Sequence, residues 1–119
     1  MAHWTLDDVP WTSFDPAKVD PELVRIVKAA SLVEYNGAAY VRYLRNVFAD
    51  DTEFMVDAER WGTEEVQHGE ALGRWAQLAD PAFDFRQSFQ RFTDGYVLHT
   101  DVAASIRGSR AGELIARCI

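Results

Sequence analysis

Residues 54–79, FMVDAERWGTEEVQHGEALGRWAQLA, carry the pattern that decides the fold class. Eight positions recur at successive steps of 4, 3, 4, 3, 4, 3 and 4, and six of them are apolar. They are Phe54, Ala58, Trp61, Glu65, His68, Leu72, Trp75 and Ala79. This spacing places all eight side chains on one face of an α-helix. Asp80-Pro81 ends the helix, because the residue before a proline is driven out of helical geometry.

A second helical segment precedes it, from Asp20 to about Ala49. Asp20-Pro21 supplies an N-cap and a proline at the first helical position. Asp50-Asp51-Thr52 then gives a break and a cap for the next helix. One face of the segment carries Val27, Ala30, Glu34, Ala38, Val41 and Phe48. Because the connection is short, the two long helices are expected to pack antiparallel.

The remaining sequence predicts an arm and two smaller helical pieces. Residues 1–19 show no helical or strand period and are expected to lie as an irregular arm over a hydrophobic groove. A short amphipathic piece is expected near residues 85–95, irregular chain over 96–110, and the start of a third helix near Ser109. Residues 20–119 therefore predict one all-α domain that forms half of a four-helix bundle.

Composition excludes several classes of partner. The chain has 119 residues, a formal charge of −7 and a pI near 4.8, which disfavours binding to nucleic acid. No apolar run approaches the length needed to span a membrane, and the acidic N-terminus does not resemble a signal peptide. A single cysteine, Cys118, excludes an intrachain disulfide framework and favours a cytoplasmic location.

Three polar side chains interrupt the apolar stripes. Glu65 and His68 lie three residues apart on the second stripe, and Glu34 lies on the first. Glu34 is about 16 residues before the turn near Asp50 and Glu65 about 15 after it, so at ~1.5 Å per residue they reach one level of the bundle. Charges placed on an apolar face need compensation. A cation supplies it, with the imidazole as a neutral ligand.

The donor set favours particular metals. Two carboxylates and an imidazole, without thiolate, suit iron or manganese, and zinc is an alternative. The small residues Ala30, Ser31, Gly37 and Ala38 around Glu34 would leave room for ions. Without a metal, His68 would be an ordinary core histidine whose ring makes a hydrogen bond. Glu64, Glu70, His3 and His99 are expected on the surface, and Tyr35, Tyr40 and Tyr43 are expected mainly to pack.

Glutamate on one helix followed by Glu-x-x-His on the next resembles half of the ferritin-like di-iron pattern. The segments SLVEYNGAAYVRYL (31–44) and RWGTEEVQHGEALGRWAQLAD (60–80) are similar to ferritin-like proteins of the rubrerythrin and acyl-ACP desaturase type. GSRAGELIARCI (108–119) resembles the opening of their third bundle helix. The resemblance implies that Glu34 and His68 are terminal ligands and that Glu65 bridges two metals.

The chain departs from that family by lacking a second Glu-x-x-His, and Glu113 falls about two turns too early to serve as the partner glutamate. Two explanations follow. Either the chain lacks a C-terminal half, which its uncapped apolar end favours, or two chains form a homodimer or larger homo-oligomer and share the site. A lone copy would leave its apolar stripes uncovered.

The resulting functional hypothesis is a non-haem di-iron or di-manganese protein that reacts with O2 or peroxide. The peroxidase, ferroxidase and desaturase-like reactions implied by the resemblance all remain open. Without a Cys-x-x-Cys pair, the rubredoxin module of full rubrerythrins is missing. The alternatives are a non-catalytic helical interaction or oligomerisation module and an iron storage protein.

Overall fold

The computed structural model of the chain describes residues 3–95, and every regular element in that range is helical. The elements are the short 3-10 turns η1 (Leu6–Asp8), η2 (Trp11–Ser13) and η3 (Pro16–Lys18), followed by the helices α1 (Pro21–Tyr35), α2 (Gly37–Val47), α3 (Thr52–Ala79) and α4 (Phe85–Gly95). The helix expected from Ser109, together with His99, Glu113 and Cys118, lies outside the described residues.

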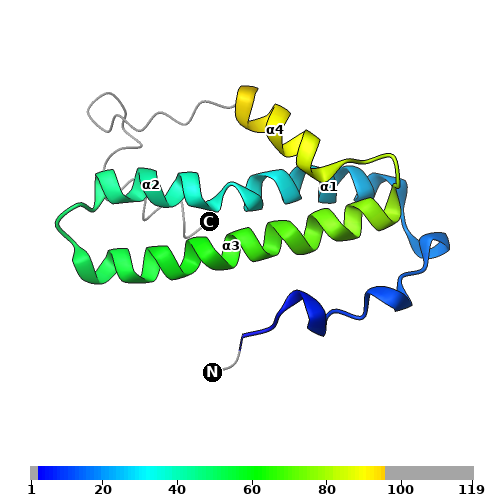
Figure 1. Cartoon of the computed structure of the whole chain (residues 1–119), viewed down its shortest axis with the longest axis horizontal. Coiled ribbons are helices and arrows are strands. Elements are labelled where there is room, and N and C mark those ends of the chain that lie inside the picture. Colours follow the sequence, from blue (N-terminus) through cyan, green and yellow to red (C-terminus); the bar gives the residue numbers. More distant parts are fainter. Residues whose placement is uncertain (1–2, 96–119) are drawn as a thin grey trace.

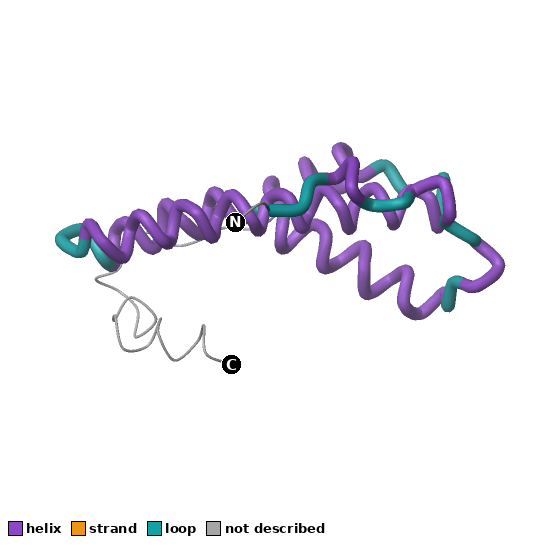
Figure 2. Tube along the Cα trace, turned by 90° about the horizontal axis from the view of Figure 1, so that it is seen from below, coloured by secondary structure: helices purple, strands orange, loops and turns teal. Residues whose placement is uncertain are grey.

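The helices form an elongated antiparallel arrangement (Figure 1). α1 and α2 follow one another along one side, and α3 runs back beside both of them. The N-terminal arm lies along the other side of α3, and α4 crosses over α1. Figure 2 shows that the end formed by α2 and the start of α3 is a simple pair of helices, whereas the opposite end is thicker. An all-helical arrangement with antiparallel long helices is therefore confirmed for the described part of the chain.

The helix boundaries follow from local capping chemistry. The Asp20 carboxylate accepts a hydrogen bond of 2.8 Å from the Glu22 amide, with Pro21 at the first position of α1. The Asp51 carboxylate accepts one of 3.0 Å from the Phe54 amide at the start of α3. α3 ends at Ala79, immediately before Asp80-Pro81. These predicted starts and stops are confirmed.

The expectation of one unbroken helix from Asp20 to about Ala49 is wrong. The helix is interrupted at Asn36, whose ψ of 13° is far from the helical value. Asparagine and glycine are both poor helix formers, and here they are adjacent. The interruption also serves packing, because a Cβ added to Gly37 would lie 2.8 Å from the Cβ of Glu65 on α3.

The predicted stripe of α3 is not the face that packs most closely against α1 and α2. The buried positions are Met55, Ala58, Gly62, Gly69, Gly73 and Ala76. Gly62, Gly69, Gly73 and Ala76 each come directly after a bulkier member of the predicted stripe. The face of α3 that packs is therefore rotated from the predicted face by one residue, or about 100°. Small side chains let two helix backbones approach closely, and bulky ones such as Trp61 and Trp75 then lie on the flank, partly buried.

The main apolar core lies where α2 turns into α3. Its members are Val41, Tyr43, Leu44, Val47, Phe48, Met55 and Ala58, with Phe54 and Trp61 packed against them. The rings of Phe48 and Phe54 stand 4.0 Å apart across the turn. A second cluster joins α4 to α1, because the Tyr35 ring makes edge contacts with Phe85 at 5.1 Å and Phe89 at 4.6 Å. Along α3, Glu65 and His68 lie between Ala58 of the first cluster and Gly73, which packs against Phe85 of the second.

Candidate metal centre

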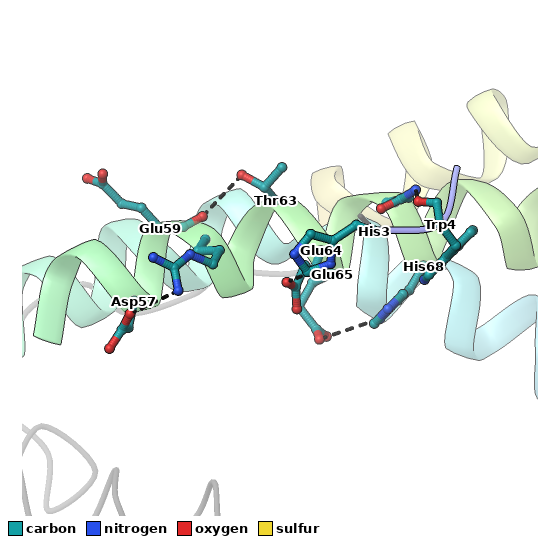
Figure 3. Close-up of polar contacts among 10 residues, drawn as sticks. His3, Trp4, Asp57, Glu59, Thr63, Glu64, Glu65 and His68 are labelled. Carbon is teal, nitrogen blue, oxygen red and sulfur yellow. Dashed lines mark hydrogen bonds and ion pairs between the residues drawn. The ribbon is translucent and has the colours of Figure 1, made fainter. Parts of the chain in front are cut away.

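The structure brings Glu34, Glu65 and His68 together at one level of the helix pair. The Nδ1 atom of His68 lies 3.6 Å from a carboxylate oxygen of Glu34 and 3.7 Å from one of Glu65. One donor atom from each residue can be chosen so that all three lie within 4.8 Å of one another. Figure 3 shows Glu65 and His68 extending from the same side of α3. Within residues 3–95, this is the one group of three or more potential metal ligands.

Close backbone contact between α1 and α3 makes this meeting possible. Gly69 follows His68, and a Cβ added to it would lie 2.5 Å from the Cα of Tyr35, the neighbour of Glu34. On the other side of the cluster, Gly37 packs against the Cβ of Glu65. α3 therefore lies close to the end of α1 on one side of the three polar residues and close to the start of α2 on the other. Side chains from each helix can then meet without bridging a wide gap.

The cluster is half-buried and open on one side. The side chains of Glu65, Glu34 and His68 are 20%, 32% and 42% exposed. This corrects the expectation of charges buried on the packing face, because the face that carries them flanks the closest contact. Desolvation alone therefore gives little reason to require a cation. The spacing of the donor atoms is the stronger indication.

The spacing of His68 from the two carboxylates is too long for direct hydrogen bonds and is compatible with a shared cation. Separations of 3.6 and 3.7 Å between ring nitrogen and carboxylate oxygens are too long for a hydrogen bond. With metal–ligand bonds of about 2.1 Å, two ligands of one ion stand roughly 3.0 Å apart at right angles and roughly 4.2 Å apart when opposite. Both observed separations fall inside that interval. Carboxylate and imidazole donors suit iron, manganese or zinc.

The N-terminal arm contributes to the site, which the sequence did not predict. The ring of Trp4 stacks on His68 with a centroid distance of 5.9 Å and an interplanar angle of 1°. The side chain of Gln67 donates a hydrogen bond of 2.6 Å to the Trp4 carbonyl. His3 lies 3.7 Å from Glu64, and Figure 3 places both beside Trp4. No periodic pattern signals contacts between residues more than sixty positions apart.

The other residues considered from the sequence lie away from the cluster or pack. Glu70 is exposed on α3. Tyr35 follows Glu34 but turns its ring to Phe85 and Phe89. Tyr43 belongs to the core at the α2–α3 turn. These positions match the packing role expected for Tyr35 and Tyr43.

One ion pair fixes α1 against the end of α3. The Lys28 ammonium donates a hydrogen bond of 2.6 Å to the Asp80 carboxylate, and the Ala82 amide donates one of 3.1 Å to its other oxygen. The contact with Lys28, followed by that with Ala82, holds the pKa of Asp80 below its ordinary value. The pair ties the two helices together on the far side of Tyr35 from the α2–α3 core.

The fold and the cluster define a class: an all-helical protein with a carboxylate–histidine group between two antiparallel helices. Comparison with known proteins does not assign the chain to a family, since no protein-family model, curated protein or solved structure matches it. None of the helices within residues 3–95 is long and apolar enough to cross a lipid bilayer.

Proposed function

We propose that the chain binds a transition metal through Glu34, Glu65 and His68 and forms half of a dinuclear iron or manganese centre. The observation that carries the proposal is the separation of 3.6 and 3.7 Å between the His68 nitrogen and two carboxylates from different helices. Glu34, Glu65 and His68 would each supply one metal-ligand atom, and all three side chains are partly exposed to solvent. Iron is the preferred metal, because two carboxylates and one imidazole form a hard, nitrogen- and oxygen-rich donor set.

Three protein donors leave coordination positions for other ligands. A six-coordinate iron or manganese ion would keep about three positions for water, an oxidant or donors from another molecule. Glu34, Glu65 and His68 would hold the ion, and bound iron(II) would supply one-electron reducing chemistry towards O2 or peroxide. The protein's own contribution is to hold two carboxylates and one imidazole at fixed spacing. It also shields Glu65 most strongly among the three.

A second copy of the chain is the proposed source of the remaining ligands. The side chains of Leu23, Ile26 and Val33 on α1 are between 46% and 61% exposed. With Ala30 they form a stripe at steps of 3, 4 and 3 that ends beside Glu34. A stripe of this kind favours helix–helix association. Pairing of two copies along it would bring two half-sites together in a symmetric dimer.

The reaction class is tested by following iron(II) in the loaded protein. Protein incubated anaerobically with Fe2+ is mixed with O2 or with hydrogen peroxide, and the remaining iron(II) is measured with a chelating dye. Loss of iron(II) faster than in Glu65→Gln protein, at the same total iron, supports oxidative chemistry at the site. Equal rates in both proteins contradict it. Faster oxidation by peroxide than by O2 would identify a peroxidase-type rather than a ferroxidase-type reaction.

The same distances also fit a second candidate function. A cationic His68 would form ion pairs with Glu34 and Glu65 at 3.6 and 3.7 Å without any metal. The chain would then be a non-catalytic helical interaction module in which this polar group contributes to pairing. The two functions differ in their response to a chelator. The interaction module keeps the same Tm in EDTA, whereas a metal-loaded protein loses stability when its ion is removed.

A further inference from the structure

If His68 is a metal ligand, its imidazole ring requires a contact that fixes its orientation. Its side chain is 42% exposed, and among the described residues no hydrogen bond is made to either ring nitrogen. Metal-binding histidines are normally oriented by a hydrogen bond from their second nitrogen. The contact that replaces such a bond here is the parallel, offset stack with Trp4, in which the ring centroids are 5.9 Å apart and the two ring planes differ by only 1°.

Two contacts with α3 residues that precede His68 hold Trp4 against the helix. The Trp4 carbonyl accepts a hydrogen bond of 2.6 Å from Gln67, the residue before His68. Its neighbour His3 lies 3.7 Å from Glu64, one turn earlier on α3. The Trp4 ring therefore has a defined position next to the imidazole and parallel to it; Figure 3 shows the two residues as neighbours.

The arm continues along α3 in the same direction. Trp11 stacks under the guanidinium of Arg74 at 4.6 Å, and Phe14 makes an edge contact with Trp75 at 5.9 Å. The indole nitrogen of Trp11 also donates a hydrogen bond of 2.7 Å to the Leu6 carbonyl, which fixes the arm's own shape. Attachment of the arm thus does not depend on Trp4 alone. Within residues 3–19 of the arm, however, Trp4 is the one residue whose ring contacts a member of the cluster.

We infer that Trp4 is a positioning residue of the metal centre, which holds the His68 imidazole with Nδ1 towards Glu34 and Glu65. This inference rests on the proposed metal-binding function. The parallel, offset stack places the indole against part of the imidazole and opposes rotation of that ring away from the carboxylates. Removing the indole lets the imidazole rotate into solvent, so the protein must reorient it each time a metal binds. Trp4 thereby raises metal affinity without being a ligand.

The test compares metal affinity in three variants of the full chain. Co2+ is titrated into each protein and binding is followed by its visible absorption and by calorimetry. Trp4→Ala is expected to weaken Co2+ binding about fivefold to tenfold, within the range that pairs of aromatic rings contribute. Trp4→Phe keeps a ring on His68 and is expected to remain within about twofold of the wild type. Trp11→Ala, which removes the other tryptophan of the arm from Arg74, is the matched control and should bind like the wild type.

A second measurement reports the orientation of His68 without metal. In NMR spectra of the apo protein, the ring protons of His68 should show a ring-current shift that disappears in Trp4→Ala and persists in Trp11→Ala. Wild-type affinity in Trp4→Ala overturns the inference, as does equal weakening in both alanine variants, which would assign the effect to arm attachment in general. If the wild-type chain itself takes up no Co2+, the proposed function fails, a result distinct from the failure of Trp4 alone.

Discussion

The backbone of Gly69 on α3 lies directly against the backbone of Tyr35 on α1. A Cβ added to Gly69 would stand 2.4 Å from the Tyr35 amide nitrogen, a distance that real Cβ atoms do not reach. Because the obstructing atoms belong to the backbone, no side-chain rotation can relieve the clash. This single contact sets the separation of the helices that carry Glu34 and His68.

Gly69→Ala is therefore expected to destabilise the protein by about 2–3 kcal/mol, through overpacking at a helix contact. Thermal unfolding followed by circular dichroism should show a fall in Tm of roughly 10 °C. Gly95→Ala is the matched control, because a Cβ there meets nothing within 4 Å. It should leave the Tm unchanged or raise it slightly. Equal Tm values for the two variants would mean that α1 and α3 do not approach as described.

The Lys28–Asp80 pair predicts a pH-dependent contribution to stability. Since the folded state lowers the pKa of Asp80, the ionised carboxylate stabilises the fold at pH values above its ordinary pKa. That contribution is lost as the pH falls through the lowered value, when the carboxylate becomes protonated. Asp80→Asn should thus lower the urea midpoint at neutral pH, and the difference from the wild type should shrink towards about pH 2.

Asp57→Asn controls for the change in net charge, since Asp57 is exposed on α3 and makes only a 3.5 Å contact with Arg60. A difference between Asp80→Asn and wild type that stays constant from neutral to acidic pH would contradict the assigned role of the ion pair.

The exposed stripe on α1 predicts self-association. Ile26→Glu places a charge in the centre of that stripe and should weaken the dimer roughly hundredfold, because a carboxylate would be buried in each half of the interface. Val56→Glu alters a comparably exposed valine on α3, outside the stripe, and should have no such effect. Light scattering across a concentration series measures the change. A wild-type chain that is monomeric at all concentrations, with and without metal, would rule out pairing through α1.

Local chemistry made much of this fold predictable. Asp20-Pro21 and Asp51 predict where helices begin, and Asp80-Pro81 predicts where one ends, because capping depends on a few consecutive residues. The level match of Glu34 and Glu65 follows from equal distances to one turn, which a count along the chain supplies. The break at Asn36 has a weaker signal, in the neighbouring asparagine and glycine.

The register of α3 and the role of the arm were harder to predict for different reasons. Bulky apolar residues give the stronger periodic signal, so Trp61 and Leu72 indicated a packing face that belongs to Gly62 and Gly73. The glycines and Ala76 do form a stripe of their own, but its meaning depends on how closely α1 approaches. The stack of Trp4 on His68 depends on the path of the whole arm, which no local pattern encodes.

The metal content of the protein after loading tests most directly whether the cluster binds a metal. Wild-type protein, Glu65→Ala, His68→Ala and the exposed control Glu70→Ala are each incubated with Fe2+ under anaerobic conditions, desalted, and analysed for iron and for helical content. Stoichiometric iron is expected in the wild type and in Glu70→Ala. Loss of iron is expected in Glu65→Ala and His68→Ala, with helical content largely intact. Iron retained by Glu65→Ala and His68→Ala at the wild-type level would contradict metal binding by the cluster.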